Sequence, residues 1–291
     1  MRRRRTFGAM SAPASASAAP ALHDARPIGV FDSGIGGLTV ARAVNQLLPQ
    51  ERLVYFGDTA HLPYGDKSTA AIQAYSVKIC DVLLRQHCKV ILIACNSASA
   101  AAYELVREYV GSKAQVLNVI DPIVRHIGQH YAGREVGLIG TKQTVGSNVY
   151  RKKLDALDRD IRLHALATPL LAPMVEEGFV RGAVSQSVIN TYLSDPALAD
   201  IEALVLACTH YPLIREQIEE YYQGQIDVLD PSAIVAEALR ELLQAHDLAA
   251  PAAVRPPQHH FYVSDFTPSF AESTRLFFGQ EVNLEHYPLW E

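Results

Sequence analysis

Two cysteines, Cys95 and Cys208, each follow an unbroken apolar run and precede a small polar residue. The runs, residues 90–94 and 203–207, are typical of strands that are covered on both faces in a parallel sheet. Ligands of open α/β sheets bind beyond the carboxyl ends of the strands, so we expect both thiols at a site. A thiol at the N-terminus of the next helix favours its thiolate, and a neighbouring imidazole such as that of His210 can exchange its proton. Two equivalent thiols indicate a reaction with two faces.

A structural role is the alternative, because buried free cysteines are common in protein cores. Against it, polar residues follow each cysteine where a core would continue with apolar ones: Asn96-Ser97 after the first and Thr209-His210 after the second. The remaining cysteines are Cys80, on the apolar face of a predicted helix, and Cys88, for which we predict no role. No C-x-x-C or zinc-ligand spacing occurs, so we predict no metal site and free thiols of a reducing compartment.

A glycine-rich segment, residues 32–37, closes the first predicted strand and opens a helix. Such a loop can direct backbone N–H groups at a carboxylate or phosphate. The dinucleotide fingerprint requires Gly or Ala where this chain has Thr39, so the match to a nucleotide site is weak although Asp58 ends the next strand at a suitable distance. A tight turn with Asp32 as helix N-cap is an equally good interpretation.

Two further loops carry polar residues. The segment 56–65 ends a strand and contains Pro, Tyr and Gly, which suits either a substrate contact or an irregular connection. The segment 167–178 places Glu176 and Glu177 after an apolar stretch, where solvated acids at a helix end are the default expectation.

Composition restricts the class of protein. The chain has 291 residues, 49% hydrophobic and 20% charged, which suits two soluble α/β units better than one. No apolar run approaches the roughly 20 residues that a membrane helix requires. Residues 1–26 hold five arginines and one aspartate, a net +4 that leaves −9 for the rest of a chain of net charge −5. An acidic body without a basic stripe argues against nucleic acid as the main partner.

Residues 1–26 also form a low-complexity segment of arginines followed by Ala, Ser and Pro. An export signal would need an apolar region of about 7 to 15 residues, which this segment lacks. We therefore predict a disordered tail.

Strand and helix patterns alternate along the chain, which predicts βαβ crossovers and mainly parallel sheets. The predicted strands are residues 27–32, 52–57, 89–95, 115–119, 135–140, 161–166, 202–208, 226–229, 259–263 and 282–286. The clearest predicted helices are residues 38–48, 69–87, 98–109, 183–193, 211–222 and 232–246. Residues 136–141 resemble residues 28–33 at an offset of 108, close to the 113 between the two cysteines, which suggests two related units although ordinary βα turns could produce it too.

Taken together, these motifs resemble the glutamate racemases of the cofactor-independent aspartate/glutamate racemase superfamily. The resemblance runs from about residue 27 to near the C-terminus and is carried by residues 29–38, 55–58, 63–65, 94–100 and 206–214. Two positions depart from the family: Ser97 stands where Thr is usual, and Thr168-Pro169 where many members have Cys-Pro. The first keeps a hydroxyl, and the second leaves Glu176 the weakest assignment.

The resemblance implies an α/β fold of two similar doubly wound, mainly parallel-sheet domains with the active site in the cleft between them. The first domain would hold residues 27–117 and 232–291, and the second residues 118–231. The implied catalytic residues are Cys95, Cys208, Asp32, His210 and Glu176, with Asp58 a weaker candidate. The implied substrate contacts are Asp32, Ser33, Tyr64, Gly65, Asn96, Ser97, Thr209 and His210. A cytoplasmic homodimer that binds glutamate, needs no cofactor and supplies D-glutamate for peptidoglycan also follows from the resemblance.

Two thiols suit such a reaction chemically. Inversion of an α-carbon requires removal of a proton on one face and its return on the other, and two opposed monoprotic groups do this while a single base tends to return the proton to its origin. A thiol of pKa about 8.5 needs little tuning to supply both protonation states near neutral pH, and the pair should titrate as a coupled system. Hydroxyls and backbone N–H groups would stabilise charge on the substrate carboxylate. The alternatives are a racemase for aspartate or another amino acid, and a non-catalytic amino-acid-binding protein.

Overall fold

Strands and helices alternate along the chain in a computed structural model, which describes residues 24–251 and 257–291. Every strand pair in these ranges is parallel, which confirms the predicted α/β class. Most of the predicted disordered tail, residues 1–23, lies outside the described residues. Among the described residues, no helix is long and apolar enough to cross a bilayer.

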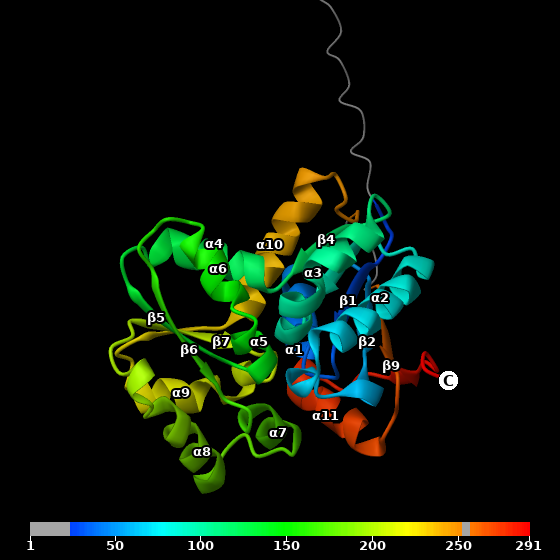
Figure 1. Ribbon diagram of the computed structural model, residues 1–291. Helices are drawn as coiled ribbons and strands as arrows, with labels where there is room; N and C mark the ends of the chain where they lie inside the picture. The colour runs from blue at the N-terminus through cyan, green and yellow to red at the C-terminus, as the bar shows by residue number, and fades with distance from the viewer. Residues whose placement is uncertain (1–23, 252–256) are drawn as a thin grey trace, which may run out of the picture.

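Two sheets form the frame of the molecule (Figure 1). The first has the order β10-β9-β2-β1-β3-β4. Its strands are β1 (Ile28–Asp32), β2 (Leu53–Gly57), β3 (Val90–Ile93), β4 (Gln115–Asn118), β9 (His260–Val263) and β10 (Leu284–His286). The second has the order β6-β5-β7-β8. Its strands are β5 (Glu135–Gly140), β6 (Arg162–Ala167), β7 (Ala203–Ala207) and β8 (Asp227–Leu229). The strands β3 and β7 are buried along their whole length, as their apolar runs predicted, and so is β1.

The helices that cover these sheets include all those predicted from the sequence. They are α1 (Leu38–Leu47), α2 (Thr69–Arg85), α3 (Asn96–Val110), α4 (Ile120–His130), α5 (Lys142–Gly146), α6 (Val149–Asp155), α7 (Leu171–Glu176), α8 (Ala183–Leu193), α9 (Arg215–Tyr222), α10 (Pro231–Ala245) and α11 (Pro268–Phe278). The predicted helix 98–109 begins earlier, at Asn96, because Cys95 itself occupies the N-cap position of α3. The predicted helix 211–222 is a 3₁₀ turn, Tyr211–Ile214, that continues into α9.

The two sheets repeat one strand order. The run β2-β1-β3-β4 in the first sheet has the same connectivity as β6-β5-β7-β8 in the second. The central strands β1 and β5 are the two segments whose sequences resemble each other, and the cysteines follow the equivalent strands β3 and β7. This topology supports the predicted relation between the two halves.

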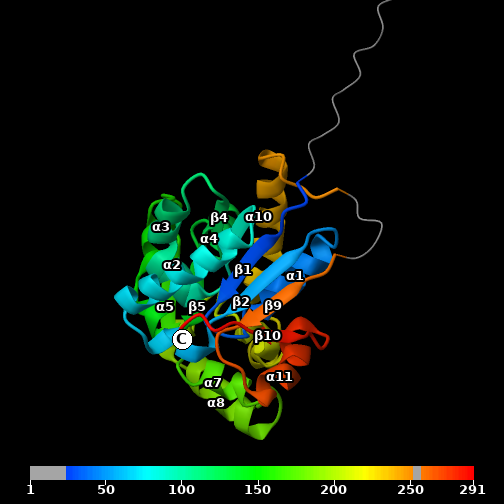
Figure 2. The same ribbon diagram turned by 90° about the vertical axis from the view of Figure 1, so that its right-hand side faces the viewer.

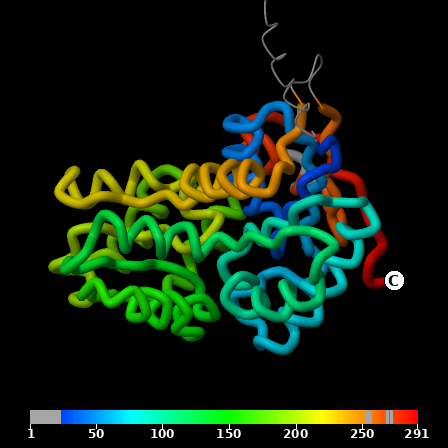
Figure 3. The backbone as a smooth tube through the Cα atoms, turned by 90° about the horizontal axis from the view of Figure 1, so that it is seen from above, coloured from blue at the N-terminus to red at the C-terminus, as the bar shows by residue number. Residues whose placement is uncertain are grey.

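The chain passes from the first sheet to the second after β4 and returns through α10. We call the part of the molecule built on each sheet a lobe. Helix α10 packs against α1 of the first lobe and against α4 and β7 of the second. Figure 3 shows the two lobes side by side with α10 running along them, and Figure 2 shows the first sheet with the C-terminal strand at its edge. The division at residues 117 and 231 stays a prediction.

A buried ion pair lies in the first lobe. The ammonium of Lys89, just before β3, lies 2.7 Å from a carboxylate oxygen of Glu51, and both side chains are fully buried. Lys89 also donates to the carbonyls of Asp24 and Leu248, each at 2.6 Å, and Glu51 accepts the N–H of Ala250 at 2.7 Å. The pair therefore joins the segment before β1 and the segment after α10, which also contact each other through the N–H of Asp24 and the carbonyl of Ala249, to the start of β3.

Candidate active site

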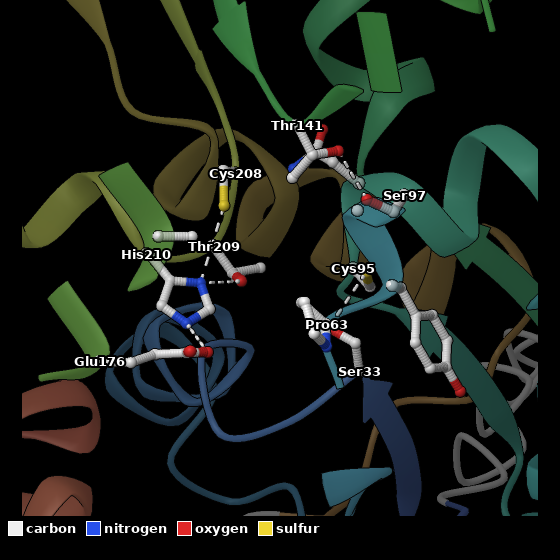
Figure 4. Close-up of a pocket in the computed structure, with 13 residues that line it drawn as sticks. Ser33, Pro63, Cys95, Ser97, Thr141, Glu176, Cys208, Thr209 and His210 are labelled. Atoms are coloured by element: carbon white, nitrogen blue, oxygen red, sulfur yellow. Dashed lines mark hydrogen bonds and ion pairs between the residues drawn. The ribbon is translucent and has the colours of Figure 1, made fainter. Parts of the chain in front are cut away.

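A pocket lies where the carboxyl ends of the two sheets meet, and its empty volume is about 390 Å³ (Figure 4). Its lining comprises Ser33, Pro63, Tyr64, Gly65, Cys95, Asn96, Ser97, Thr141, Ala172, Glu176, Cys208, Thr209 and His210. The structure thus brings together ten of the twelve residues that the resemblance implied for the site, and the exceptions are Asp32 and the weaker candidate Asp58.

Four of the lining residues follow equivalent strands of the two sheets. Ser33 follows β1 and Thr141 follows β5, while Cys95 and Cys208 lie just beyond β3 and β7. Parallel strands present their carboxyl ends at one edge, so the two halves direct matching groups into one cavity. Figure 4 shows Cys95 with Ser33 on one side, and Cys208 with His210 and Glu176 on the other.

Cys95 has the surroundings of a protonated thiol. Its Sγ accepts the N–H of Ala98 at 3.4 Å, as expected of a helix N-cap, and its S–H donates to Oγ of Ser33 at 3.7 Å. Burial and the nearby charge of Asp32 nevertheless raise the pKa of Cys95 to about 12. The N–H of Ala98 lowers the pKa of this thiol, as expected of a helix N-terminus, but burial and Asp32 outweigh that contact, so the predicted net preference for the thiolate is not found.

Cys208 has a cation beside it instead. Nδ1 of His210 lies 3.6 Å from Sγ of Cys208, and its Nε2 lies 2.9 Å from Oε1 of Glu176. Burial lowers the pKa of His210, but the hydrogen bonds to Cys208 and Glu176 outweigh it and hold the pKa well above its usual range. With both ring nitrogens protonated, His210 donates to Glu176 on one side and to the sulfur on the other. The imidazolium stabilises negative charge on Cys208.

Asp32 does not line the pocket but acts on the site through its charge. Its side chain is fully buried, one oxygen accepts the N–H of Gly34 at 3.1 Å, and the other has no hydrogen-bond partner among the described residues. Burial raises the pKa of Asp32, against the opposing influence of His210 and of backbone N–H groups. A buried carboxyl with a free oxygen and a raised pKa is suited to exchange a proton with Cys95.

Hydrogen bonds across the pocket orient the polar lining residues. The hydroxyl of Tyr150 donates to Oδ1 of Asn96 at 2.8 Å, which leaves the amide N–H groups of Asn96 available. Oγ of Ser97 lies 2.8 Å from Oγ1 of Thr141, so the serine keeps the hydroxyl function of the family's usual threonine. Tyr64 contributes its ring and backbone, because its hydroxyl donates to Asp58 at 2.6 Å.

Three lining residues were missed by the sequence analysis: Pro63, Thr141 and Ala172. Thr141 had a usable signal, since it stands 108 residues after Ser33 in the repeated segment. Pro63 precedes a predicted contact, and Ala172 carries no polar group that a motif could reveal.

The glycine-rich loop serves close packing. None of residues 34–37 lines the pocket. A Cβ at Gly36 would lie 2.4 Å from the ring of His210, and one at Gly37 would lie 2.5 Å from Cβ of Asp32. Helix α1 begins at Leu38 with Gly37 as its N-cap, so the N-cap predicted for Asp32 is wrong. The loop therefore lets the first lobe approach the His210 segment of the second.

Comparison with known proteins shows the family of the chain. The family model of the Asp/Glu/Hydantoin racemases matches residues 28–239, which is more than half of the chain. The chain belongs to the Asp/Glu/Hydantoin racemase family. Members are isomerases, and the two-domain α/β fold is that of this racemase's structural relatives.

Among curated relatives of this racemase is the glutamate racemase of Syntrophus aciditrophicus, 41% identical over 264 residues that cover 90% of this chain and 95% of that protein. The crystal structure of glutamate racemase from Francisella tularensis in complex with D-glutamate superimposes with a TM-score of 0.85 at 36% identity, covering 92% of this racemase and 99% of that chain. A glutamate racemase isoform from Bacillus anthracis gives the same TM-score at 31% identity, over 91% and 98% of the two chains.

Proposed function

We propose that this racemase interconverts L- and D-glutamate by two-base proton transfer at the α-carbon, with Cys95 and Cys208 as the acid/base pair. The observation that carries the proposal is that two thiols line one pocket and have different charged side chains beside them. Burial and Asp32 keep Cys95 protonated, whereas the His210 imidazolium lies 3.6 Å from the sulfur of Cys208. One base and one acid in a single cavity are what a stereo-inversion requires.

In the proposed reaction, the Cys208 thiolate removes the α-proton of one enantiomer and the Cys95 thiol returns a proton on the opposite face. The roles exchange for the other enantiomer, and the thiols then differ from the resting state by one proton each. To return to the resting state, Cys208 must lose one proton and Cys95 must gain one. The proton of Cys208 leaves to solvent once the product has dissociated, which the His210 imidazolium, held 2.9 Å from Glu176, favours. The protonated carboxyl of Asp32 gives a proton to Cys95 and takes one back from solvent. Because Asp32 and His210 each serve a different thiol, either direction can be reset.

Charge that develops on the substrate carboxylate needs hydrogen-bond donors. The hydroxyls of Ser33 and Thr209 and the amide of Asn96 line the same pocket, with Ser97 and Thr141 beside them. Donors that are fixed before the reaction stabilise such charge without reorganisation. The backbone of Tyr64-Gly65 completes the proposed substrate contacts.

Glutamate is the proposed substrate because curated relatives that cover about nine-tenths of the chain are glutamate racemases. We propose that its product, D-glutamate, supplies peptidoglycan synthesis in the cytoplasm, and that the protein works as a homodimer without an added cofactor.

The test is circular dichroism of L-glutamate, and separately of L-aspartate, with purified protein and no cofactor. The proposal expects loss of optical activity for glutamate, and deuterium at the α-carbon of the product in D₂O. Faster racemisation of aspartate would reassign the substrate. Absence of exchange with every acidic amino acid would indicate a binding protein, and unlabelled product in D₂O would rule out proton transfer through solvent-exchanging thiols.

A further inference from the structure

One buried carboxylate outside the pocket accepts hydrogen bonds from several segments of the first lobe. Asp58, directly after β2, is fully buried. Its Oδ2 accepts the hydroxyl of Tyr64 at 2.6 Å, and its Oδ1 accepts the hydroxyl of Ser264 and the indole N–H of Trp290, each at 2.7 Å. Nδ1 of His61 lies 3.1 Å from Oδ2. These donors come from the loop after β2, the segment after β9 and the C-terminus.

The Tyr64 end of this network reaches the candidate site. Pro63, Tyr64 and Gly65 line the pocket, and Tyr64 is only 1% exposed. A Cβ at Gly65 would lie 2.9 Å from the side chain of Thr141, so this segment lies directly against the second lobe. A small shift of the segment would therefore change the width of the pocket.

The ring of Trp290, at the other end of this network, packs against three side chains. It meets the imidazole of His61 edge-on at 4.4 Å and the ring of Tyr75 at 5.4 Å, and the ammonium of Lys78 lies 4.5 Å above it. His61 in turn stacks on Tyr75 at 4.0 Å. Trp290 thus lies against His61, in the segment that leads from β2 to residues 63–65, and the C-terminal strand lies at the edge of the first sheet (Figure 2).

We infer that Asp58 is a positioning residue for residues 63–65 of the proposed glutamate site, and that Trp290 at the C-terminus holds Asp58 in place. The inference rests on the proposed function. A buried carboxylate is costly unless its oxygens are hydrogen-bonded, and here each oxygen accepts at least two side-chain groups. An amide could not replace it, because it offers one acceptor oxygen and would set its own N–H groups against the donors.

The kinetic consequence follows from what the segment does. Asp58 lines no part of the pocket, and the side chains that it contacts are not those beside the two thiols, so we assign it no part in proton transfer itself. Its loss would loosen contacts that the substrate and the transition state share, which raises KM and leaves kcat nearly unchanged. Loss of a hydrogen bond to a charged group predicts an increase in KM of about tenfold for Asp58→Asn. Trp290→Phe keeps an aromatic ring but removes the pyrrole ring with its N–H donor, which is one of the four side-chain donors to Asp58, so we expect a smaller increase of about threefold.

The experiment compares these variants with Asp227→Asn. Asp227 also accepts a tyrosine hydroxyl, from Tyr131 at 2.8 Å, but lies on β8 and lines no part of the pocket. KM and kcat for glutamate are measured well below each variant's melting temperature, together with amide hydrogen exchange of residues 59–66. We expect higher KM, unchanged kcat and faster exchange in Asp58→Asn and Trp290→Phe, and wild-type values in Asp227→Asn.

Unchanged KM in Trp290→Phe and Asp58→Asn would overturn the inference, as would a lower melting temperature with wild-type kinetics, which is the mark of a merely structural role. If Asp58→Asn does not fold, Trp290→Phe decides. If the wild-type protein does not racemise glutamate, the proposed function fails, and exchange at residues 59–66 decides separately whether Asp58 positions the loop.

Discussion

Gly36 lies so close to His210 that the two residues leave no room for a single methyl group between them. A Cβ at Gly36 would lie 2.4 Å from Cε1 and 2.7 Å from Nδ1 of the imidazole. The same Nδ1 faces the sulfur of Cys208. The loop of one lobe therefore fixes the orientation of the proton-carrying side chain of the other.

Gly36→Ala is expected to displace the imidazole from Cys208 and to lower kcat by about 100-fold, the usual worth of a positioned acid/base group. The backbone at Gly36 has no positive φ, so the substitution adds no strain of its own. Gly146→Ala, at a glycine with open space around it, is the matched control. Turnover in Gly36→Ala that equals the control would contradict the proposed contact.

Removal of either thiol should abolish racemisation while the protein stays folded. For Cys95→Ala and Cys208→Ala we expect losses of about 100-fold to 10,000-fold in kcat, measured by circular dichroism of glutamate. Cys80→Ala makes the same change at a buried cysteine outside the pocket and should keep its turnover. Near wild-type turnover in either pocket variant would eliminate the two-base assignment.

Glu176→Gln should move the pH profile of the enzyme. Burial opposes protonation of His210, while Cys208 and Glu176 raise its pKa. Without the carboxylate the imidazolium loses its proton at lower pH, so the alkaline limb of the kcat/KM profile should move to lower pH, with kcat/KM about tenfold lower on that limb. Glu177→Gln is the neighbouring control. A profile that coincides with that of the control would separate Glu176 from His210.

Tyr150→Phe tests the orientation of Asn96. The tyrosine hydroxyl is the donor to Oδ1 of Asn96 at 2.8 Å, and without it the amide loses the contact that fixes its rotation. We expect an increase in KM of about fivefold, typical of one lost hydrogen bond, with little change in kcat. Tyr131→Phe, in the same lobe but away from the pocket, provides the comparison. Equal KM values in the two variants would contradict the role given to Tyr150.

Alkaline pH should destabilise the fold through its buried thiols. Burial raises the pKa of Cys88 from 9.0 to about 12. Between these values the unfolded thiol ionises and the folded one does not, so its stabilising contribution is present below pH 9 and is lost as pH rises, by about 1.4 kcal/mol per pH unit. In urea titrations, the free energy of unfolding should therefore fall less steeply above pH 9 for Cys88→Ala than for the wild type. Parallel curves would refute this.

The sequence predicted the frame of the molecule well, because the signals of parallel strands are local. The unbroken apolar runs before Cys95 and Cys208 mark doubly covered strands without any knowledge of their neighbours. Helix α7 was not predicted, since six residues hold too few turns for a clear periodicity. Glu176, at its end, entered only through the resemblance, and the structure brings it within 2.9 Å of His210.

Contacts between distant segments could not be predicted in this way. The bond between Asp58 and Trp290 joins residues 232 positions apart, and that between Lys89 and Leu248 spans 159. Nothing in the local pattern around either member indicates its partner. The raised pKa of Cys95 was not predicted for the same reason, since its burial and the position of Asp32 beside it both depend on how distant segments such as β1 and β3 pack together.

Thermodynamics limits what the different surroundings of the two sulfurs can do to the kinetics of the two enantiomers. Mirror-image amino acids have the same free energy in water, so a racemase works at an equilibrium constant of one. The ratio of kcat/KM for the two enantiomers must then equal one as well, whatever stands beside each thiol. The His210 and Asp32 environments can therefore give the two enantiomers different values of kcat and of KM. They can never give them different values of kcat/KM.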